Sequence, residues 1–331
     1  MVNDGAENPL VMLYSVQMEF RTLGKTGLNV SLLSLGTGGA RQLGQSQGMS
    51  QSQQTTLVRS ALDLGVNLID TSAEYGESET ILGHALKKVP RDDYNICTKW
   101  PPWVDGQLAE DPDLLINSLE RSLKRLQTDH VEIFLFHGPR ADEYHNLVDR
   151  FYPTMEKLQT QGKIGFIGLS TQFAGEPTQM TANIALKENP DIWDTIMLKY
   201  GILNQAAAQE TLPLAIQNNV GIMNMAAVRV KLPDPDLLQE LIKEWANQGY
   251  IKHDSLPDED PLDWLVHDDV ISVVGAGYKF AADHPAVATV ITGTSNISHL
   301  EENAVALDKP YLSPEDTKLV KKLFGEINEY V

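Results

Sequence analysis

The chain has 331 residues, and its 26 Lys and Arg against 45 Asp and Glu give a formal net charge of −19. A hydrophobic fraction of 42% with 21% charged residues is typical of a globular protein and excludes general disorder. The acidic balance argues against nucleic acid or an anionic membrane as the main partner, because the long-range field repels phosphate. The single cysteine, Cys97, excludes an intramolecular disulfide framework and any cysteine-rich metal site, and it fits a reducing cytoplasm.

The first 17 residues are expected to form a flexible leader, and Met18 begins the segment that is predicted to fold. Asp4 and Glu7 stand where a signal peptide would carry positive charge, so export is not predicted. The longest apolar runs are far shorter than the roughly 20 residues that a membrane-spanning helix needs. A cytoplasmic protein without a membrane partner is therefore expected.

Two short β-rich runs, 20–22 and 28–30, flank a glycine-containing turn and predict a β-hairpin. Eight more β-rich runs follow, at 32–35, 66–69, 94–98, 131–136, 164–169, 195–198, 220–225 and 287–291. Helical spacing fills the intervals; in 114–126, for example, leucines recur at steps of four, four and three. This alternation predicts parallel βα units. The pattern alone fits a closed barrel and a doubly wound sheet equally well.

One interval, 228–286, is longer than the others. It holds one clear helical segment, 235–247, and then a Pro/Asp-rich stretch, LPDEDPLDWLVHDD. We expect it to be an inserted loop that covers one end of the sheet, since long loops of this kind are often active-site lids. After the last strand, Ser-Pro-Glu-Asp opens a helix predicted over 313–330.

Polar residues stand where the predicted strands end, where a barrel would gather them around one cavity. Asp70 and Tyr75 follow the second strand, Lys99 ends the third and His137 follows the fourth. A lysine ammonium lowers the pKa of a nearby tyrosine, and an aspartate keeps that lysine charged. Such a tyrosine can protonate a carbonyl oxygen as hydride reaches the carbon, while a histidine hydrogen-bonds the same oxygen. Taken singly, each residue also has a plain structural role as a cap, a loop lysine, a packing tyrosine or a structural histidine.

The combination Asp70-Thr-x-x-x-Tyr75-Gly76, Thr98-Lys99 and His137 resembles the aldo-keto reductase family. RTLGKTGLNVS is similar to that family's opening hairpin, and VITGTSNISHLEEN to its C-terminal cofactor segment. The resemblance implies one (β/α)8 TIM barrel over 18–331, with an N-terminal β-hairpin, a long loop after strand 7 and a C-terminal helix. It also implies hydride transfer between an extended nicotinamide dinucleotide and a carbonyl or alcohol carbon. Tyr75 would be the general acid/base, tuned by Asp70 and Lys99, and His137 would orient the carbonyl.

The same resemblance assigns cofactor contacts. At the nicotinamide end they are Thr37, Ser170, Thr171, Met197 and Met225, where the family usually has Asn at 171, Gln at 197 and often an aromatic residue at 225. At the adenine end they are Gly293, Thr294, Ser295, His299, Glu302 and Asn303. Many NADP-specific members have Lys at 293 and Arg at 299, and neither charge is present here. Backbone amides of 293–295 and the Ser295 hydroxyl are still able to hold a phosphate. NADP(H) is therefore the expected cofactor and NAD(H) the alternative.

Three tryptophans are candidates for the substrate pocket. Trp100 and Trp103 follow Lys99 and either wall the pocket or pack on the barrel rim, whereas Trp264 lies in the long interval, where a solvated loop face is the plainer interpretation. No metal site is expected, because no ligands stand at suitable spacing. The expected function is oxidoreduction of a small aldehyde, ketone or sugar. The alternatives are an NAD-dependent aldose dehydrogenase and a cofactor-binding regulatory subunit with little turnover.

Overall fold

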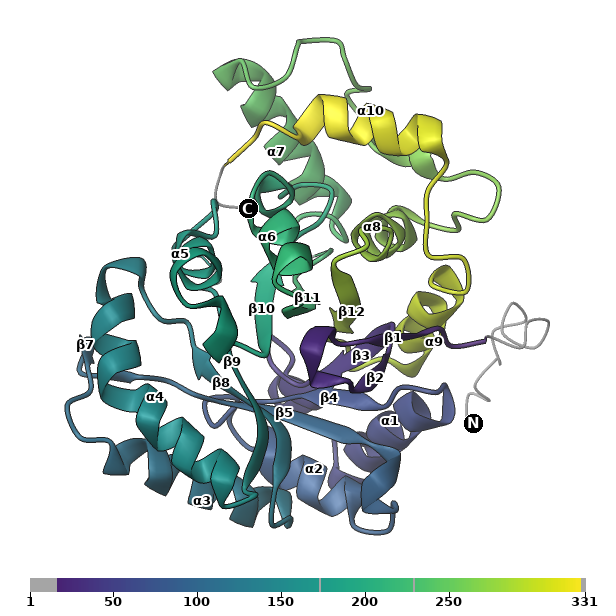
Figure 1. Ribbon diagram of the computed structural model, residues 1–331. Helices are drawn as coiled ribbons and strands as arrows, with labels where there is room; N and C mark the ends of the chain where they lie inside the picture. Colours follow the sequence, from purple (N-terminus) through teal and green to yellow (C-terminus); the bar gives the residue numbers. More distant parts are fainter. Residues whose placement is uncertain (1–16, 173, 229, 329–331) are drawn as a thin grey trace, which may run out of the picture.

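Eight parallel strands form a closed barrel surrounded by helices in the computed structural model, which describes residues 17–172, 174–228 and 230–328 (Figure 1). The strands are β3 (Leu33–Gly36), β4 (Leu68–Asp70), β5 (Asn95–Trp100), β8 (Val131–His137), β9 (Ile164–Ser170), β10 (Thr195–Lys199), β11 (Gly221–Met225) and β12 (Val287–Thr292). They follow one another around the barrel in chain order, and β12 pairs with β3 to close it. The predicted (β/α)8 barrel is confirmed, and the doubly wound sheet is excluded. The predicted leader, 1–17, lies outside the described residues except for Gln17.

Side chains alternate between the inside of the barrel and its helical coat, as the two-residue period of a strand requires. One buried cluster, including Leu68, Cys97, Ile133, Leu135 and Met223, fills the interior. A larger cluster lies between the strands and the helices. Because side chains fill the interior, a ligand has room only at an end of the barrel.

The predicted hairpin covers the N-terminal end of the barrel. Strands β1 (Phe20–Thr22) and β2 (Asn29–Ser31) pair antiparallel. Leu23 and Val30 are fully buried against the interior cluster. Gly24 is required here, since its φ is +51° and a Cβ would lie 2.2 Å from the backbone nitrogen of Gly221. The hairpin thus leaves the C-terminal end for the site.

Ten α-helices are described. They are α1 (Gln51–Asp63), α2 (Ser78–Leu86), α3 (Asp113–Leu126), α4 (Tyr144–Thr160), α5 (Met180–Glu188), α6 (Thr211–Gln217), α7 (Pro235–Gln248), α8 (Val273–Ala282), α9 (Ile297–Ala306) and α10 (Pro314–Phe324). The leucines of α3 that predicted it are all buried. Helix α10 starts as predicted, capped by the Ser313 hydroxyl. It ends at Phe324, just before Gly325, and not at residue 330 as predicted.

The long interval is not a single loop. Helix α7 packs against α10 through Trp245 and Phe324, whose ring centres are 5.9 Å apart, beside the barrel (Figure 1). Helix α8, which connects β11 to β12 in the barrel, contacts β12 and α9. It was not predicted because most of its residues are buried, which removes the amphipathic period.

The Pro/Asp-rich stretch belongs to the core as well as to the surface. It contains a short 3₁₀ helix, η8 (Asp263–Leu265), and both Leu262 and Leu265 are fully buried. Among the described residues of the interval, Val228, Val230, Pro233 and Tyr278 line the cavity described below, and none of them belongs to the Pro/Asp-rich stretch. The prediction that the whole interval covers the barrel mouth is therefore wrong for its Pro/Asp-rich half.

Candidate active site

The C-terminal ends of the strands surround an open cavity of about 1080 Å³. Ten of the residues predicted for the site line it: Asp70, Tyr75, Lys99, Trp103, His137, Ser170, Thr171, Met197, Met225 and Gly293. They come from seven different strands or the loops that follow them, so closure of the barrel is what brings them together.

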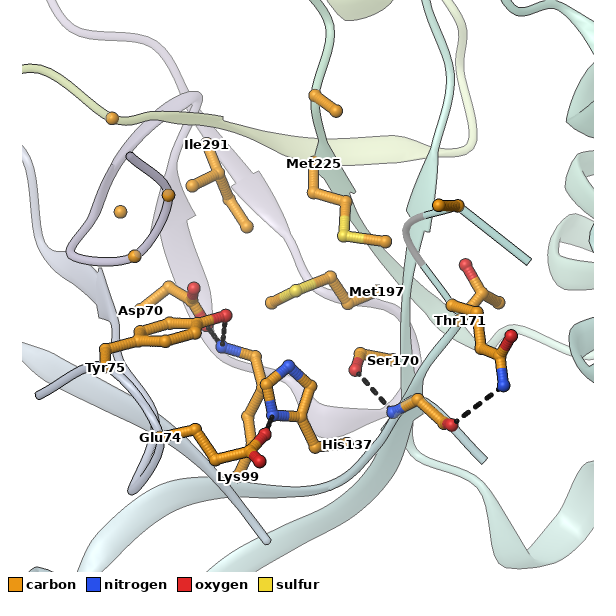
Figure 2. A pocket seen from close by; sticks show the side chains of 18 of the residues that line it. Asp70, Glu74, Tyr75, Lys99, His137, Ser170, Thr171, Met197, Met225 and Ile291 are labelled. Atoms are coloured by element: carbon orange, nitrogen blue, oxygen red, sulfur yellow. Dashed lines mark hydrogen bonds and ion pairs between the residues drawn. The ribbon is translucent and has the colours of Figure 1, made fainter. Parts of the chain in front are cut away.

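Lys99 and Asp70 form a buried ion pair at the base of the cavity (Figure 2). Lys99 Nζ lies 2.5 Å from Asp70 Oδ1 and also donates to the carbonyl oxygen of Thr71 at 2.8 Å. Burial opposes the charge on Lys99, but Asp70 and then Tyr75 favour it, and the net effect raises the pKa of Lys99. Lys99 is therefore an ammonium ion across the neutral range.

Tyr75 lies beside this pair, with its Oη 3.5 Å from Lys99 Nζ. Its ring rests on Gly38, where a Cβ would lie 2.6 Å from the ring, so only glycine fits there. Burial raises the pKa of Tyr75, and the opposing effect of Lys99 does not cancel it. The sequence argument expected Lys99 to lower this pKa, and that net direction is wrong for the structure described. Tyr75 therefore holds its proton at neutral pH and suits the role of an acid.

His137 has two hydrogen-bond partners on one ring nitrogen. Its Nδ1 lies 2.9 Å from a carboxylate oxygen of Glu74 and 3.2 Å from Ser72 Oγ. Figure 2 shows Glu74 on one side of the ring and the second ring nitrogen directed away from it, into the space beside Tyr75 and Met197. The hydrogen bond from His137 lowers the pKa of Glu74, against a smaller effect of burial. Sequence reasoning missed Glu74 and Ser72, although both lie inside the 70–76 motif.

The wall at the predicted nicotinamide end is mainly apolar. Met197, Met225 and Ile291 form it, as Figure 2 shows. Ser170 Oγ accepts from the backbone N–H of Gly138 at 3.3 Å, and it keeps its own proton for a ligand. The Thr171 hydroxyl donates to Gln179 instead, at 2.8 Å.

Thr37 does not line the cavity, but it lies between Gly36 and Gly38, which do. Its side chain is fully buried, and its Oγ1 has no hydrogen-bond partner among the described residues. An unpaired buried hydroxyl costs free energy unless a ligand or water supplies its hydrogen bond.

The apolar thioethers of Met197 and Met225 beside a few polar groups suit a flat heterocycle that carries an amide.

Most of the residues predicted for the adenine end lie on or just before α9, outside the cavity lining. Thr294 Oγ1 accepts from Asn296 N, and Asn303 donates to Thr292 Oγ1, so both side chains form internal hydrogen bonds. His299 and Glu302 are exposed. Sequence reasoning missed Arg41, which lines the cavity with Nη1 3.5 Å from Ser295 Oγ. Its place in the glycine-rich loop after the first strand was the available signal.

The three tryptophans have different positions. Trp103 lines the cavity, and its Nε1 donates to the carbonyl oxygen of Gly138 at 3.3 Å. Trp100 is 4% exposed and packs on Phe151, with ring centres 4.8 Å apart, in the helical coat. Trp264 packs beside the core and donates to the carbonyl oxygen of Pro261, also outside the cavity lining. Of the three, only Trp103 is placed to touch a ligand in the cavity.

Neither metal ligands nor membrane spans occur in the part of the chain that the structure describes. Within 17–172, 174–228 and 230–328, no three His, Cys, Asp or Glu side chains gather as a metal site would require. None of the described helices combines the length and apolar character that a membrane crossing requires.

Comparison with known proteins gives the family. A family model described as "Aldo/keto reductase family" matches residues 34–324. The chain belongs to the aldo/keto reductase family. It is similar to L-galactose dehydrogenase of Arabidopsis thaliana, at 28% identity over 88% of each chain, and to D-threo-aldose 1-dehydrogenase of a Pseudomonas species, at 26% identity over 85% of this chain and 92% of that one. The fold is that of the aldo-keto reductase of Bacillus halodurans in its holo form, with a TM-score of 0.70 and coverage of 93% and 97% at 24% identity.

Family membership establishes the class of reaction. This aldo/keto reductase is an oxidoreductase that moves hydride between a nicotinamide cofactor and the carbonyl or alcohol carbon of a small molecule. The apolar wall, the Ser170 hydroxyl and the unpartnered Thr37 Oγ1 fit such a cofactor at the cavity.

Proposed function

We propose that this enzyme reduces a small aldehyde, ketone or open-chain sugar with NADPH, and that Tyr75 donates the proton. The observation that carries the proposal is a Tyr75 with a raised pKa, 3.5 Å from the Lys99 ammonium in the cavity wall. A tyrosine that keeps its proton at neutral pH is ready to give it to a carbonyl oxygen, as reduction requires.

Tyr75, Lys99 and Asp70 have different roles in the proposed proton transfer. A bound nicotinamide cofactor would supply the hydride for the carbonyl carbon. Tyr75 then protonates the oxygen and becomes a phenolate, which the adjacent Lys99 ammonium stabilises. Asp70 offsets the charge of Lys99 and holds Nζ in place. Lys99 and Asp70 thus act by stabilising the phenolate that Tyr75 becomes after it has donated its proton.

His137 and Glu74 act on the substrate oxygen from the other side. The Glu74 carboxylate accepts a hydrogen bond from His137 Nδ1, and this contact orients the ring so that its second nitrogen faces the space beside Tyr75. Glu74 is therefore proposed as a positioning residue for His137.

NADP(H) is the proposed cofactor, with NAD(H) as the alternative. Arg41 beside Ser295 supplies the positive charge that positions 293 and 299 lack. A charge-assisted contact to the 2′-phosphate contributes about 1.5–3 kcal/mol, which is roughly ten- to a hundredfold in affinity. The backbone near Gly293 lines the cavity and stays a candidate for the phosphate, whereas His299 is exposed and outside the cavity lining.

Equilibrium titration by quenching of protein fluorescence tests this choice. Arg41→Gln should weaken NADPH binding at least tenfold and NADH binding less, with Arg121→Gln, an exposed arginine of α3, as the charge-matched control. Equal losses for both cofactors would assign Arg41 to the shared pyrophosphate. Tighter binding of NADH than of NADPH by the unaltered protein would favour NAD(H).

A second candidate, an NAD-dependent aldose dehydrogenase, is favoured by the names of the two sugar dehydrogenases that resemble this chain. Oxidation would use the same Tyr75 in the reverse role, as the base that accepts the hydroxyl proton. A screen of carbonyls with reduced cofactors and of aldoses with oxidised ones, followed by nicotinamide absorbance, separates the two directions. Cofactor binding without turnover of any substrate would favour the regulatory subunit. A cytoplasmic location remains proposed, supported by the single, buried cysteine.

A further inference from the structure

A second arginine, Arg140, lines the same cavity and follows His137 by three residues. Its guanidinium carbon lies 4.2 Å from the centre of the Trp103 ring, and one of its N–H groups donates to the carbonyl oxygen of Gly106 at 3.2 Å. No carboxylate of the described residues lies within 4.0 Å of it. Arg140 is exposed, so its charge is open to a ligand that enters the cavity.

The other charges on this side of the cavity are already compensated. Lys99 pairs with Asp70, and Glu74 pairs with His137. Of the three cations that line the cavity, Arg41, Lys99 and Arg140, only Lys99 has an acidic partner among the described residues, and Arg140 is the unpaired one that lies beside Trp103.

The structure also holds this cation in place. Trp103, on which it stacks, begins the small hairpin of β6 (Trp103–Val104) and β7 (Gln107–Leu108). The indole is anchored to the carbonyl oxygen of Gly138, the residue that follows His137. A guanidinium held on an aromatic ring loses little freedom when it binds an anion, and its planar fork suits a carboxylate or a phosphate.

We propose that Arg140 binds an anionic group of the substrate, and that the enzyme acts on short carbonyl compounds with a carboxylate or phosphate at the far end. The inference rests on the proposed function, because the carbonyl must lie at Tyr75 and His137. Three residues from His137 to Arg140 keep their Cα atoms within about 11 Å. Because both residues line the same cavity, short carbonyl compounds with an anionic end are the suitable probes.

Matched substrates test the inference. The probes are 4-oxobutanoate against butanal for a carboxylate, and glyceraldehyde 3-phosphate against glyceraldehyde for a phosphate. In Arg140→Gln, kcat/KM for the anionic member of each pair should fall ten- to a hundredfold, mostly through KM, and change less than twofold for the neutral member. Arg140→Lys should recover part of the loss, and Arg121→Gln should have no effect.

The outcomes separate this inference from the proposed function. Equal losses for charged and neutral probes would overturn it, because Arg140 would then only support Trp103. No change in Arg140→Gln would overturn it as well. If no carbonyl is turned over, the proposed function fails, and fluorescence titration of the protein with 4-hydroxybutanoate against 1-butanol still decides the inference. Binding of the anion that is equally strong in Arg140→Gln would then count against it.

Discussion

Tyr75 shows at the level of one residue how burial changes a sequence-based expectation. The positions of Asp70, Tyr75, Lys99 and His137 at strand ends, together with the family resemblance that implied a barrel, predicted that they meet. The direction of the Tyr75 pKa was not predictable in the same way, because it is a balance between burial and the nearby Lys99. Only the folded geometry decides which effect is larger.

Substitution of Tyr75 by Phe tests its proposed role. We expect turnover to fall by about 10²–10⁴-fold or more, since the proton donor is lost. Cofactor affinity should stay within about twofold, because the ring still packs on Gly38. Steady-state rates and fluorescence titration measure the two effects, and near-normal turnover would show that Tyr75 is not the acid.

Sequence analysis did not find the site residues whose positions depend on the path of a loop. Glu74 and Arg41 lie in loops whose path no periodicity specifies. Trp100 was predictable in part: Lys99 faces the cavity, so the next residue of β5 must face the helical coat.

Glu74→Gln keeps the shape of the side chain and removes its charge. The lowered pKa of Glu74 means that the wild-type carboxylate is ionised throughout the neutral range and into mild acid. The ionised carboxylate holds His137 through its Nδ1, so the variant should lose kcat/KM for reduction wherever Glu74 is ionised in the unaltered enzyme. Half of the Glu74 side chain is exposed and water screens it, so we expect a three- to tenfold loss at neutral pH, which disappears in acid as Glu74 itself is protonated in the unaltered enzyme.

The matched control is Glu77→Gln, an exposed acid three residues further along the same segment. Its pH profile should coincide with that of the unaltered enzyme. A pH-independent loss in Glu74→Gln would show that Glu74 only packs against His137, and an unchanged profile would show that its charge has no effect.

At the scale of the elements, the pattern of hydrophobic residues predicted the strands and the helices that bury one face. All eight barrel strands, the hairpin and α3 follow from it. Helix α8 does not, because a helix that is buried nearly all round carries no period to read. The 262–265 segment was misread for another reason: two buried leucines stand among many acids and prolines, and composition hides them.

Replacement of 257–267 by a Gly/Ser linker of equal length tests the structural role of that segment. Leu262 and Leu265 are fully buried, and each contributes about 1.5–3 kcal/mol by burial. His267 Nε2 also contacts Asp316 at 2.9 Å and ties the segment to α10. We expect the free energy of unfolding in urea to fall by about 3–6 kcal/mol, while KM changes less than twofold because these residues do not line the cavity.

A single substitution tests the same structural role with a smaller change than the linker. Leu265→Ala should lose about 2–5 kcal/mol on its own, and Glu259→Gln on the exposed part should lose almost nothing. A shifted KM with unchanged stability in the linker variant would restore the interpretation of this segment as a lid.

At the scale of the whole molecule, the enzyme combines an acidic exterior with a cavity that holds positive charges. The net charge of −19 belongs to the full chain, whereas Arg41, Lys99 and Arg140 line one cavity. A phosphate-bearing cofactor is thus repelled at long range and attracted at short range. The repulsion acts over a longer distance than the attraction, so salt screens the repulsion more strongly.

Ionic strength should therefore raise the association rate of NADPH. The Debye length falls from about 30 Å at 10 mM to about 8 Å at 150 mM, which screens the repulsion by the distant surface but not contacts of a few ångströms inside the cavity. We expect the association rate in stopped-flow fluorescence to increase about two- to fivefold over this range. Arg41→Gln should raise the dissociation rate and keep the same salt trend, because it removes a contact and leaves the surface unchanged. An association rate that falls with salt would mean that the positive charges of the cavity act at a distance and outweigh the acidic surface.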